Sequence, residues 1–385
     1  MTARCAGMDR PSSGRPDADV IVAGAGIAGL TACVLLARAG LRVVCIDPIP
    51  FPRERVGESL DWAVPALLDR IGLPAGRLIG DGIGTRKREV HGISTTGTVL
   101  IGRPPGWMSR WPLRFWLETV HIDRARFDCA LYELANSAGV RFIWDRIVSV
   151  EVDADRVMGC STQSGTLAAT WFLDASGRAR LFARAFGIDR LDGGPTRVAI
   201  WAHRNVAQSV EGTVLHLDDD SDPLRWAWEI PVSSHRQSVG VVLPEVEFRL
   251  RRAAGRGPKE ILSETVAEFP GLSTKQPSQL DRVKVRAFRS YAHNKVSGSN
   301  WMMIGEAAAF VDPLTSAGVS SAMRHAAEAA DIIRLVTQRP RRLRCDDSIG
   351  VSVPSRTSTT TRSKNCSTRR CSGGHSGSAG QHRPT

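Results

Sequence analysis

The chain has 385 residues, of which 42% are hydrophobic and 23% charged, the composition of a globular protein long enough for two domains. Its formal net charge is +12, but +8 of this charge belongs to residues 339–385, which include 10 Lys or Arg and 2 Asp. The rest of the chain is only weakly basic, so the composition excludes a strongly basic nucleic-acid-binding surface.

The eight cysteines are scattered, with no Cys-x-x-Cys pair and no paired histidine spacing. This pattern favours reduced thiols in a cytoplasmic protein over a disulfide framework or a metal site. Residues 1–18 are polar and lack the apolar core of a signal peptide, so we expect a disordered N-terminus. No apolar run approaches the ~18 residues of a membrane-spanning helix, and no transmembrane segment is expected.

The first predicted elements form a strand-turn-helix-strand unit. Residues 19–23 are an apolar strand, 24–29 read GAGIAG, and an apolar helical run follows and ends at Gly40. A second strand, 41–47, ends in an acid. This is the context in which a Gly-x-Gly-x-x-Gly sequence predicts dinucleotide binding.

Each glycine of this turn has a physical role in such a site. Gly24 allows the tight turn, Gly26 lets a pyrophosphate approach the backbone, and Gly29 lets the helix pack closely on the strand. The pyrophosphate would lie at the helix N-terminus, where free N–H groups and the helix dipole favour anions. Asp47, at the end of the second strand, could accept hydrogen bonds from ribose hydroxyls.

The middle of the chain alternates between predicted helices and β structure. After a loop, a helix is expected to be capped near Ser59 and to stop at Gly72. Residues 80–120 suggest β structure, 121–139 have a helical period, and 140–177 suggest a β-meander.

The last third begins with strands and ends with a helix. Strands are expected from Thr196 to about Glu247, and a helix near 259–268. Residues 300–318 suggest a strand, a turn and a helix start, and the helix continues to about Val336. Residues 339–385 are rich in Arg, Ser, Thr and Gly, so we expect a disordered basic tail.

Four blocks resemble the ordered motifs of the FAD-dependent monooxygenase superfamily. They are VGESL (56–60), HIDRARFD (121–128), FLDASGR (172–178) and IGEAAAFVDPLTSAG (304–318). The branch that looks most similar is that of the flavin-dependent halogenases and halogenase-like oxidoreductases, and the resemblance extends from about residue 19 to 336. It implies an α/β fold, with a doubly wound FAD-binding domain of the Rossmann-like, glutathione-reductase type and an antiparallel β-sheet substrate domain.

The resemblance also implies where the two domains lie in the chain. The FAD-binding domain is expected to be discontinuous and to comprise residues 19–80, 120–180 and 296–338. Residues 81–119 and 181–295 are expected to form the substrate domain.

The same resemblance assigns further FAD contacts to this chain. The arginine after the helix start in the second block, Arg124, would contact the flavin nucleotide, and its alternative is a surface ion pair. Gly305 and Asp312 would place backbone amides and an acid near the pyrophosphate and ribityl chain. Pro313 and Gly318 belong to a turn that would open a helix pointing at the flavin ring.

Two residues depart from the family pattern. Glu306 stands where Asp is usual, which adds one methylene that the loop must accommodate. Thr315 stands where indole-specific halogenases carry a glutamate. The second departure argues against free tryptophan as the substrate.

Halogenases carry a lysine roughly 30 residues after the Gly-Glu pair, which holds hypohalous acid and presents it to the substrate. Lys87 stands 29 residues after Glu58 and is the candidate for this catalytic role. Because Arg86 and Arg88 flank it, a solvated strand edge is the alternative.

The stretch RWAWEIPV carries the last motif. Trp226 and Trp228 are two apart, so in a strand both indoles lie on one face, and alone they predict a core. Trp-x-Trp-x-Ile-Pro resembles the diagnostic halogenase motif, at Trp226, Trp228, Ile230 and Pro231. The implied role is a wall that keeps the organic substrate from the flavin and passes only a small oxidant. Arg225 stands where the family usually has Gly.

With the resemblance, the sequence predicts an FAD-dependent oxidoreductase of the halogenase-like monooxygenase type. It would use reduced FAD and O2, with halide, to halogenate or otherwise oxidise an electron-rich aromatic or pyrrole-type small molecule. Only one Gly-x-Gly-x-x-Gly unit is present, so reduced FAD is expected from a separate flavin reductase.

Two alternatives stay open. One is an FAD-dependent hydroxylase or flavin dehydrogenase or reductase acting on an isoprenoid or phenolic substrate, in which Lys87 has no role. The other is a truncated, inactive flavin-binding protein, because the hydrophobic periodicity stops near Arg344. The isolated histidines His91, His121 and His203 are expected to be structural.

Overall fold

A computed structural model describes residues 16–53, 55–110, 117–206, 211–269, 271–272 and 280–338. By its contacts the chain divides into a unit that ends at Arg339 and a second unit, Pro340–Thr385. The expected basic tail lies outside the described residues, as does the expected disordered N-terminus up to residue 15. Within the described part, no helix is long and apolar enough to cross a membrane.

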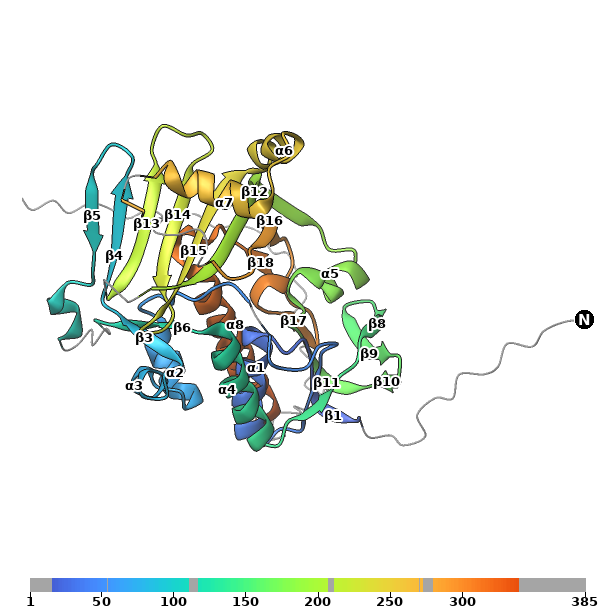
Figure 1. Cartoon of the computed structure of the whole chain (residues 1–385). Coiled ribbons are helices and arrows are strands. Elements are labelled where there is room, and N and C mark those ends of the chain that lie inside the picture. Colours follow the sequence, from blue (N-terminus) through green and yellow to red (C-terminus); the bar gives the residue numbers. More distant parts are fainter. Residues whose placement is uncertain are drawn as a thin grey trace, which may run out of the picture. The chain divides into compact units, whose positions relative to one another are not determined.

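A parallel sheet of five strands carries the N-terminal motif (Figure 1), in the order β17-β11-β1-β2-β7. Its strands are β1 (Ala18–Ala23), β2 (Val43–Ile46), β7 (Arg141–Ile143), β11 (Ala169–Asp174) and β17 (Trp301–Met303). All four pairings are parallel. Nearly every residue of β1 and β2 is buried, as expected for strands covered on both faces.

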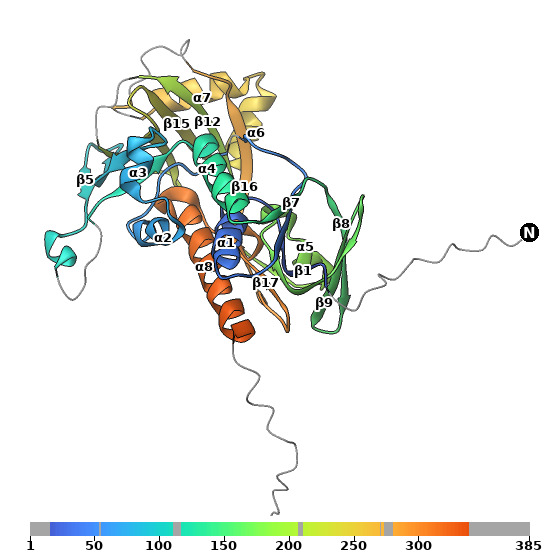
Figure 2. The ribbon, with the colours of Figure 1, turned by 90° about the horizontal axis from the view of Figure 1, so that it is seen from below.

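Helices cover one face of this sheet and a small antiparallel sheet covers the other. The helices are α1 (Ile27–Arg38), α4 (Arg124–Ser137) and α8 (Ala317–Gln338), which lie side by side in Figure 2. The second cover consists of β8 (Ile147–Asp153), β9 (Arg156–Thr162), β10 (Gly165–Leu167) and α5 (Leu181–Ala185). The two faces have separate hydrophobic cores, around Leu30 and Met323 on one side and around Phe172 and Trp301 on the other.

A larger, mostly antiparallel sheet has the strand order β18-β16-β12-β15-β14-β13-β4-β5. Its strands are β4 (Glu89–Ser94), β5 (Val99–Gly102), β12 (Arg190–Asn205), β13 (Gly212–Asp218), β14 (Arg225–Pro231), β15 (Arg236–Pro244), β16 (Lys284–His293) and β18 (Ala309–Phe310). One face packs against α7 (Pro258–Ala267) and is also contacted by α6 (Glu245–Ala253). The parallel sheet between two covers and this antiparallel sheet confirm the expected fold class.

Short elements join the two sheets. β3 (Gly84–Lys87) pairs with β6 (Thr119–Ile122), beside α2 (Val64–Ile71), α3 (Ala75–Gly80) and η1 (Gly106–Ser109). Single 3₁₀ turns follow elsewhere: η2 (Gly177–Ala179), η4 (Gly305–Ala307) and η5 (Pro313–Thr315).

Three expected boundaries were wrong. Ser59 does not cap a helix, because it is extended and bridges to His121, and α2 begins only at Val64 with a proline in its first turn. The strands end at Pro244 rather than near Glu247, because α6 begins there with two acids in its first turn. In the 121–139 segment the helix begins only after Asp123, whose carboxylate accepts from the first backbone N–H groups of α4.

Candidate functional site

The glycine turn after β1 has the shape that a diphosphate needs. Gly24 has φ +107°, and a Cβ there would lie 2.5 Å from the carbonyl oxygen of Ala175. A Cβ on Gly29 would lie 1.8 Å from the carbonyl oxygen of Gly24. Around Gly26, in contrast, no atom of the described residues other than its own chain neighbours lies within 4 Å of the ideal Cβ position. The turn is thus closed at its two outer glycines and open at the middle one.

The N-terminus of α1 begins at this open glycine. Gly26 is its N-cap, no side chain caps the helix, and no acidic residue stands in its first turn. The N–H groups that a helix leaves without intrahelical partners therefore face no competing side chain. This geometry fits the diphosphate of FAD.

Asp47 follows β2 and is buried, but its carboxylate is already in use. It accepts from the backbone N–H of Ala25 at 2.7 Å and of Ile49 at 2.9 Å. The guanidinium of Arg53 forms an ion pair with it, with one nitrogen 3.0 Å away. These contacts reach both carboxylate oxygens, so a ribose can bind Asp47 only after Arg53 moves.

Arg124 connects α4 to the Gly-Glu-Ser segment. Its guanidinium forms two 2.9 Å bonds to the carboxylate of Asp128, one turn along the helix, and donates to the carbonyl of Val56 at 2.5 Å. The side chain is only 10% exposed, so the ion pair exists but is not a surface pair. A flavin contact for Arg124 stays a prediction.

The block around Gly305 packs directly on the glycine turn. Gly305 has φ +61°, and a Cβ there would lie 3.0 Å from the Cβ of Ala28, in the first turn of α1. Glu306 next to it is exposed and lies 3.8 Å from Arg178, so its additional methylene extends toward solvent.

Asp312 holds the turn that precedes α8. It caps η5 by accepting from the N–H of Leu314 at 3.1 Å, and it forms a 2.6 Å ion pair with Arg197 of β12. Pro313 begins this turn, and Gly318 lies in the first turn of α8 with no atom within 4 Å of its ideal Cβ. Asp312 therefore ties the expected flavin turn to the large sheet.

Trp226 and Trp228 lie on the same face of β14, as predicted. They are 3% and 4% exposed, and their ring centroids are 5.5 Å apart. Gly240 on the next strand leaves room for the second ring, because a Cβ there would lie 2.3 Å from Trp228. Leu314 of η5 packs against the same cluster. The two indoles thus form part of a core that reaches the expected flavin turn.

Lys87 is 2% exposed at the end of β3. Its Nζ donates to the Ser59 hydroxyl at 2.9 Å and to the Leu60 carbonyl at 2.8 Å, and lies 4.9 Å from the ring centroid of Trp62. Burial lowers the pKa of Lys87 to about 8, although the negative charge of Asp61 opposes the shift. The alternative of a solvated strand edge is therefore wrong for Lys87.

The neighbours of Lys87 do behave as a solvated edge. The side chains of Arg86 and Arg88 are exposed and lie 3.8 Å and 3.3 Å from the carboxylate of Glu118. Successive side chains of an extended segment point to opposite sides, which separates Lys87 from both arginines.

Polar residues to which the sequence pattern assigns no catalytic role surround the lysine. Ser59 and Thr213 join their hydroxyls at 2.9 Å, and Thr213 contacts Nε2 of His121 at 3.0 Å. Beside them, Nε2 of His203 lies 2.6 Å from a carboxylate oxygen of the buried Glu58. His121 and His203 are thus both buried in polar contacts around the Gly-Glu-Ser segment.

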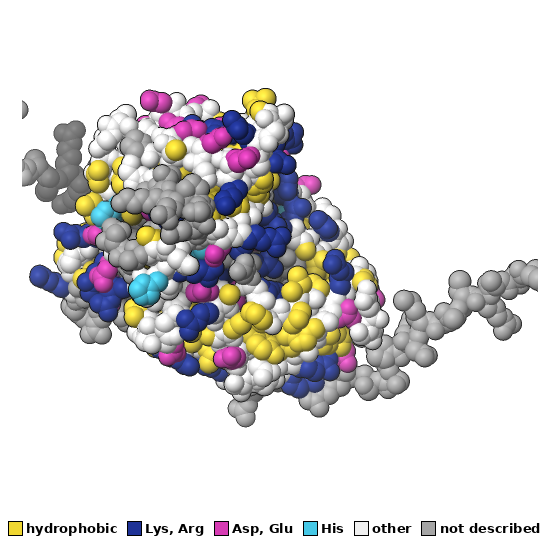
Figure 3. Space-filling model, viewed as in Figure 1, with side chains coloured by type: hydrophobic (Ala, Val, Ile, Leu, Met, Phe, Trp, Pro, Cys, Tyr) yellow, Lys and Arg dark blue, Asp and Glu magenta, His cyan; other side chains and the backbone are white. Residues whose placement is uncertain are grey.

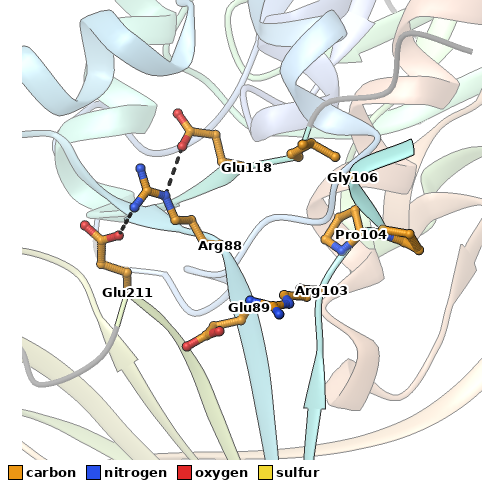
Figure 4. Close-up of a pocket in the computed structure, with 9 residues that line it drawn as sticks. Arg88, Glu89, Arg103, Pro104, Gly106, Glu118 and Glu211 are labelled. Atoms are coloured by element: carbon orange, nitrogen blue, oxygen red, sulfur yellow. Dashed lines mark hydrogen bonds and ion pairs between the residues drawn. The ribbon is translucent and has the colours of Figure 1, made fainter. Parts of the chain in front are cut away.

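A cavity of about 860 Å³ is lined by Arg88 and Glu89, the two residues that follow Lys87, and by segments around Pro104 and Glu118 (Figure 4). Arg88 projects into it and bonds to Glu118 and Glu211. Lys87 does not line the cavity.

Comparison with known proteins decides the family. The family model described as tryptophan halogenase matches residues 117–344, more than half of the chain, and an FAD binding domain model matches residues 19–55. The chain belongs to the tryptophan halogenase family. The expected halogenase branch and the expected FAD cofactor are confirmed.

Members of this halogenase family from several organisms are similar to the chain. It is 30% identical over 345 residues to the tryptophan 2-halogenase of Chondromyces crocatus, which covers 86% of this chain and 62% of that protein. It is 29% identical over 357 residues to the 1H-pyrrole-2-carbonyl-[peptidyl-carrier protein] chlorinase of Pseudomonas fluorescens, covering 83% and 76% of the two chains. The chain therefore spans less than two thirds of the first of these relatives.

Solved halogenase structures share the fold. The flavin-dependent brominase Bmp2 aligns with a TM-score of 0.72 at 24% identity, over 85% of this chain and 81% of that chain. The flavin-dependent halogenase CmlS aligns with a TM-score of 0.73 at 25% identity, over 84% and 59%.

Proposed function

We propose that this protein is an FAD-dependent halogenase, which uses reduced FAD, O2 and a halide to halogenate an electron-rich aromatic or pyrrole-type small molecule. The observation that carries the proposal is Lys87, a buried amine with a lowered pKa beside the Gly-Glu-Ser segment. The names of the halogenase relatives support the same reaction. Thr315 provides no carboxylate in η5, which favours a substrate other than free tryptophan.

FAD would be held at the glycine turn, the start of α1 and the block before α8. When bound in its reduced form, it supplies the activation of O2 that lets halide be oxidised. The residues proposed to bind it are Gly24, Gly26, Gly29, Asp47, Arg124, Gly305, Asp312, Pro313 and Gly318.

Lys87 would hold the hypohalous acid. Two of its N–H groups are bonded to Ser59 and Leu60, so one position on Nζ is left for a ligand. Trp226 and Trp228 would exclude the organic substrate from the flavin, because their buried rings have no room to move aside.

The domain boundaries are part of the proposal. Residues 19–80, 120–180 and 296–338 would form the FAD-binding domain, which the five-stranded parallel sheet and its helices support. Residues 81–119 and 181–295 would form the substrate domain, which contributes most of the large sheet. β18 is the exception, because it lies in the last FAD segment but pairs with β16.

A separate flavin reductase would supply the reduced cofactor, since the chain contains a single Gly-x-Gly-x-x-Gly unit. The cytoplasm is the proposed compartment. Cys33, Cys45, Cys129 and Cys160 are free thiols, which supports a reducing environment.

The test is product analysis with reduced FAD, O2 and bromide. We expect bromide-dependent products from candidate aromatics by mass spectrometry, and a loss of roughly 100-fold or more in rate for Lys87→Ala. Arg86→Ala is the matched control, because that side chain is exposed on the same strand. Only hydroxylated product in excess bromide, or full activity of Lys87→Ala, would select the hydroxylase or dehydrogenase alternative instead.

A further inference from the structure

A chain of buried hydrogen bonds runs from Lys87 to the proline of the tryptophan motif. After Lys87 it passes through the hydroxyls of Ser59 and Thr213 and then through both ring nitrogens of His121. The hydroxyl of Thr85 follows, 3.2 Å from Nδ1 of His121, and donates to the Pro231 carbonyl at 2.6 Å. We call this series the Lys87–Pro231 chain.

Its two ends fix the direction of every bond. The carbonyl of Pro231 can only accept, so the single hydroxyl proton of Thr85 is directed to it. Thr85 must then accept from His121, which places the ring proton on Nδ1. Nε2 of a neutral ring is left as an acceptor, so the hydroxyl of Thr213 donates to it.

The other half of the chain follows in the same way. Because the proton of Thr213 is used at His121, the hydroxyl of Ser59 must donate to Thr213. Ser59 can then only accept from Lys87, and a lysine side chain donates. Every hydrogen bond in the series is therefore donated in the direction from Lys87 to Pro231. Each hydroxyl or ring proton is used in a single bond.

The direction of the chain requires a neutral imidazole. An imidazolium would donate from Nε2 and reverse the bond to Thr213. His121 is completely buried, and burial together with the charge of Lys87 lowers its pKa well below the usual histidine value. The ring is thus suited to one tautomer, protonated on Nδ1.

We propose that His121 and Thr213 are positioning residues for Lys87, which hold Ser59 as an acceptor so that a single direction on the lysine Nζ faces the oxidant. With the bonds to Ser59 and Leu60 in place, the third direction carries an N–H in the ammonium and the lone pair in the neutral amine. The Pro231 carbonyl anchors the far end, which gives this proline a role beyond ending the strand. The inference rests on the proposed function only for the identity of the oxidant.

The elements that pack around the Lys87–Pro231 chain also carry charged groups. Asp61, just before α2, interacts with Lys87, and its negative charge opposes the lowering of the Lys87 pKa that burial causes. Arg86 and Glu118, on β3 and beside β6, are exposed and pair with each other. Glu58 next to Ser59 is paired with His203 of β12.

The first experiment observes the wild-type protein and uses a variant only for assignment. In protein with ¹⁵N-labelled histidine, we expect the His121 ring at neutral pH to be protonated on Nδ1 and unprotonated on Nε2. His121→Asn assigns the resonances. An imidazolium at neutral pH, or a proton on Nε2 alone, would overturn the direction of the chain.

The second experiment breaks one link. Thr213→Val keeps the shape of the side chain but removes the hydroxyl, and Thr213→Ser keeps the hydroxyl as the matched control. We expect Thr213→Val to lower the pKa of Lys87 by roughly half a pH unit, because Ser59 loses its polarising acceptor. The pKa is followed by NMR of lysine labelled at Cε, with Lys87→Met for assignment, and Thr213→Ser should match the wild type.

The activity profile separates the two proposals. If the protein halogenates, the pH dependence of kcat should move with the Lys87 pKa in Thr213→Val while KM for the substrate stays unchanged. An unchanged Lys87 pKa and an unchanged profile in Thr213→Val would overturn the positioning role and leave the proposed function intact. If halogenation fails but the NMR results are as expected, the proposed function is overturned and the Lys87–Pro231 chain still stands.

Discussion

Burial of the charged amine of Lys87 destabilises the folded protein. An amine that is charged in water but buried here loses solvation. Among the described residues it gains in exchange two hydrogen bonds, the face of Trp62 and the negative charge of Asp61. A pKa of about 8, against 10.5 for an ordinary lysine, corresponds to about 3 kcal/mol of destabilisation of the charged form. A residue retained against such a cost is a strong candidate for a functional role.

This cost predicts a pH-dependent stability difference between the wild type and Lys87→Met. Between about pH 8 and 10.5 the unfolded chain binds a proton at Lys87 that the folded chain has lost, so wild-type stability rises with pH in this window. Below pH 8 both states are protonated and the full cost is present. The free energy of unfolding of Lys87→Met minus that of the wild type should therefore fall by about 2 kcal/mol from pH 7.5 to 10. Urea unfolding at each pH measures it, and a difference independent of pH would contradict a lowered Lys87 pKa.

At the scale of elements, β14 separates two different environments. Ala227 on one face belongs to the core under α7, whereas Trp226 and Trp228 on the other face belong to the core that includes Leu314. The period of two in the sequence predicts this alternation, but the identity of the facing elements comes only from the structure. A core and a wall are compatible roles for the same indoles.

Trp228→Ala should therefore have two separate effects. Loss of a buried indole should lower the free energy of unfolding by about 3–5 kcal/mol whatever its role. If the ring also excludes the substrate from the flavin, hydroxylated product should appear beside halogenated product in mass spectra. Phe182→Ala is the control, since it removes a buried ring from the core beside the parallel sheet, around Phe172 and Trp301, and should destabilise without new products. Hydroxylation by both variants would contradict a specific wall.

Arg225, which stands where the family usually has Gly, forms ion pairs that connect several elements. It stands at the start of β14, and its guanidinium lies 3.1 Å from Asp218 and 3.3 Å from Glu247 of α6, with a further contact to Glu268. Figure 3 shows acidic and basic side chains side by side over this end of the sheet. The arginine thus ties α6 and the end of α7 to the strand that carries the tryptophans.

Arg225→Gln should weaken this attachment. We expect the free energy of unfolding to fall by about 1–2 kcal/mol, because three partners share a partly buried guanidinium. Arg249→Gln is the control: its pair with Glu245 is highly exposed, and its loss should change stability by less than about 0.5 kcal/mol. Urea unfolding at low and high salt measures the stability of both variants. Equal losses in Arg225→Gln and Arg249→Gln would show that the Arg225 network contributes no more than an exposed ion pair.

For the whole molecule, the sequence predicted what local pattern encodes. The strand-turn-helix around the glycines and the shared face of the two tryptophans depend on short periodic segments, and the structure has both. The α/β class, which the resemblance implied, was confirmed as well. The flanking arginines suggested an exposed strand at Lys87, because sequence neighbours do not reveal which side of a strand is buried. The Lys87–Pro231 chain was not predicted, because its links, such as the one between Ser59 and Thr213, join positions up to 154 residues apart.

The same limit applies to the cofactor site. Spacing predicts Asp47 beside the nucleotide, but it cannot show that Arg53 already bonds the carboxylate. The resemblance places Asp312 near the pyrophosphate and ribityl chain, but it cannot show the ion pair with Arg197 of the large sheet, which joins residues 115 positions apart. The turn at Asp312 and the large sheet are therefore joined by this ion pair, so a ligand that binds at the turn should also raise the stability of the described unit.

FAD should stabilise the molecule by mass action, and Gly26 separates binding from folding. A Cβ at Gly26 meets no atom of the described residues within 4 Å apart from its chain neighbours. Its φ of −78° suits any residue, so Gly26→Ala should fold with a loss of no more than about 1 kcal/mol. The added methyl would occupy the space that the diphosphate needs, so the affinity for FAD should fall at least about 10-fold. Excess FAD should then raise Tm for the wild type and much less for the variant. Gly29→Ala is the contrast, because its Cβ would overlap the Gly24 carbonyl and should destabilise even without FAD. An equal rise in Tm for the wild type and Gly26→Ala would mean that the diphosphate lies elsewhere.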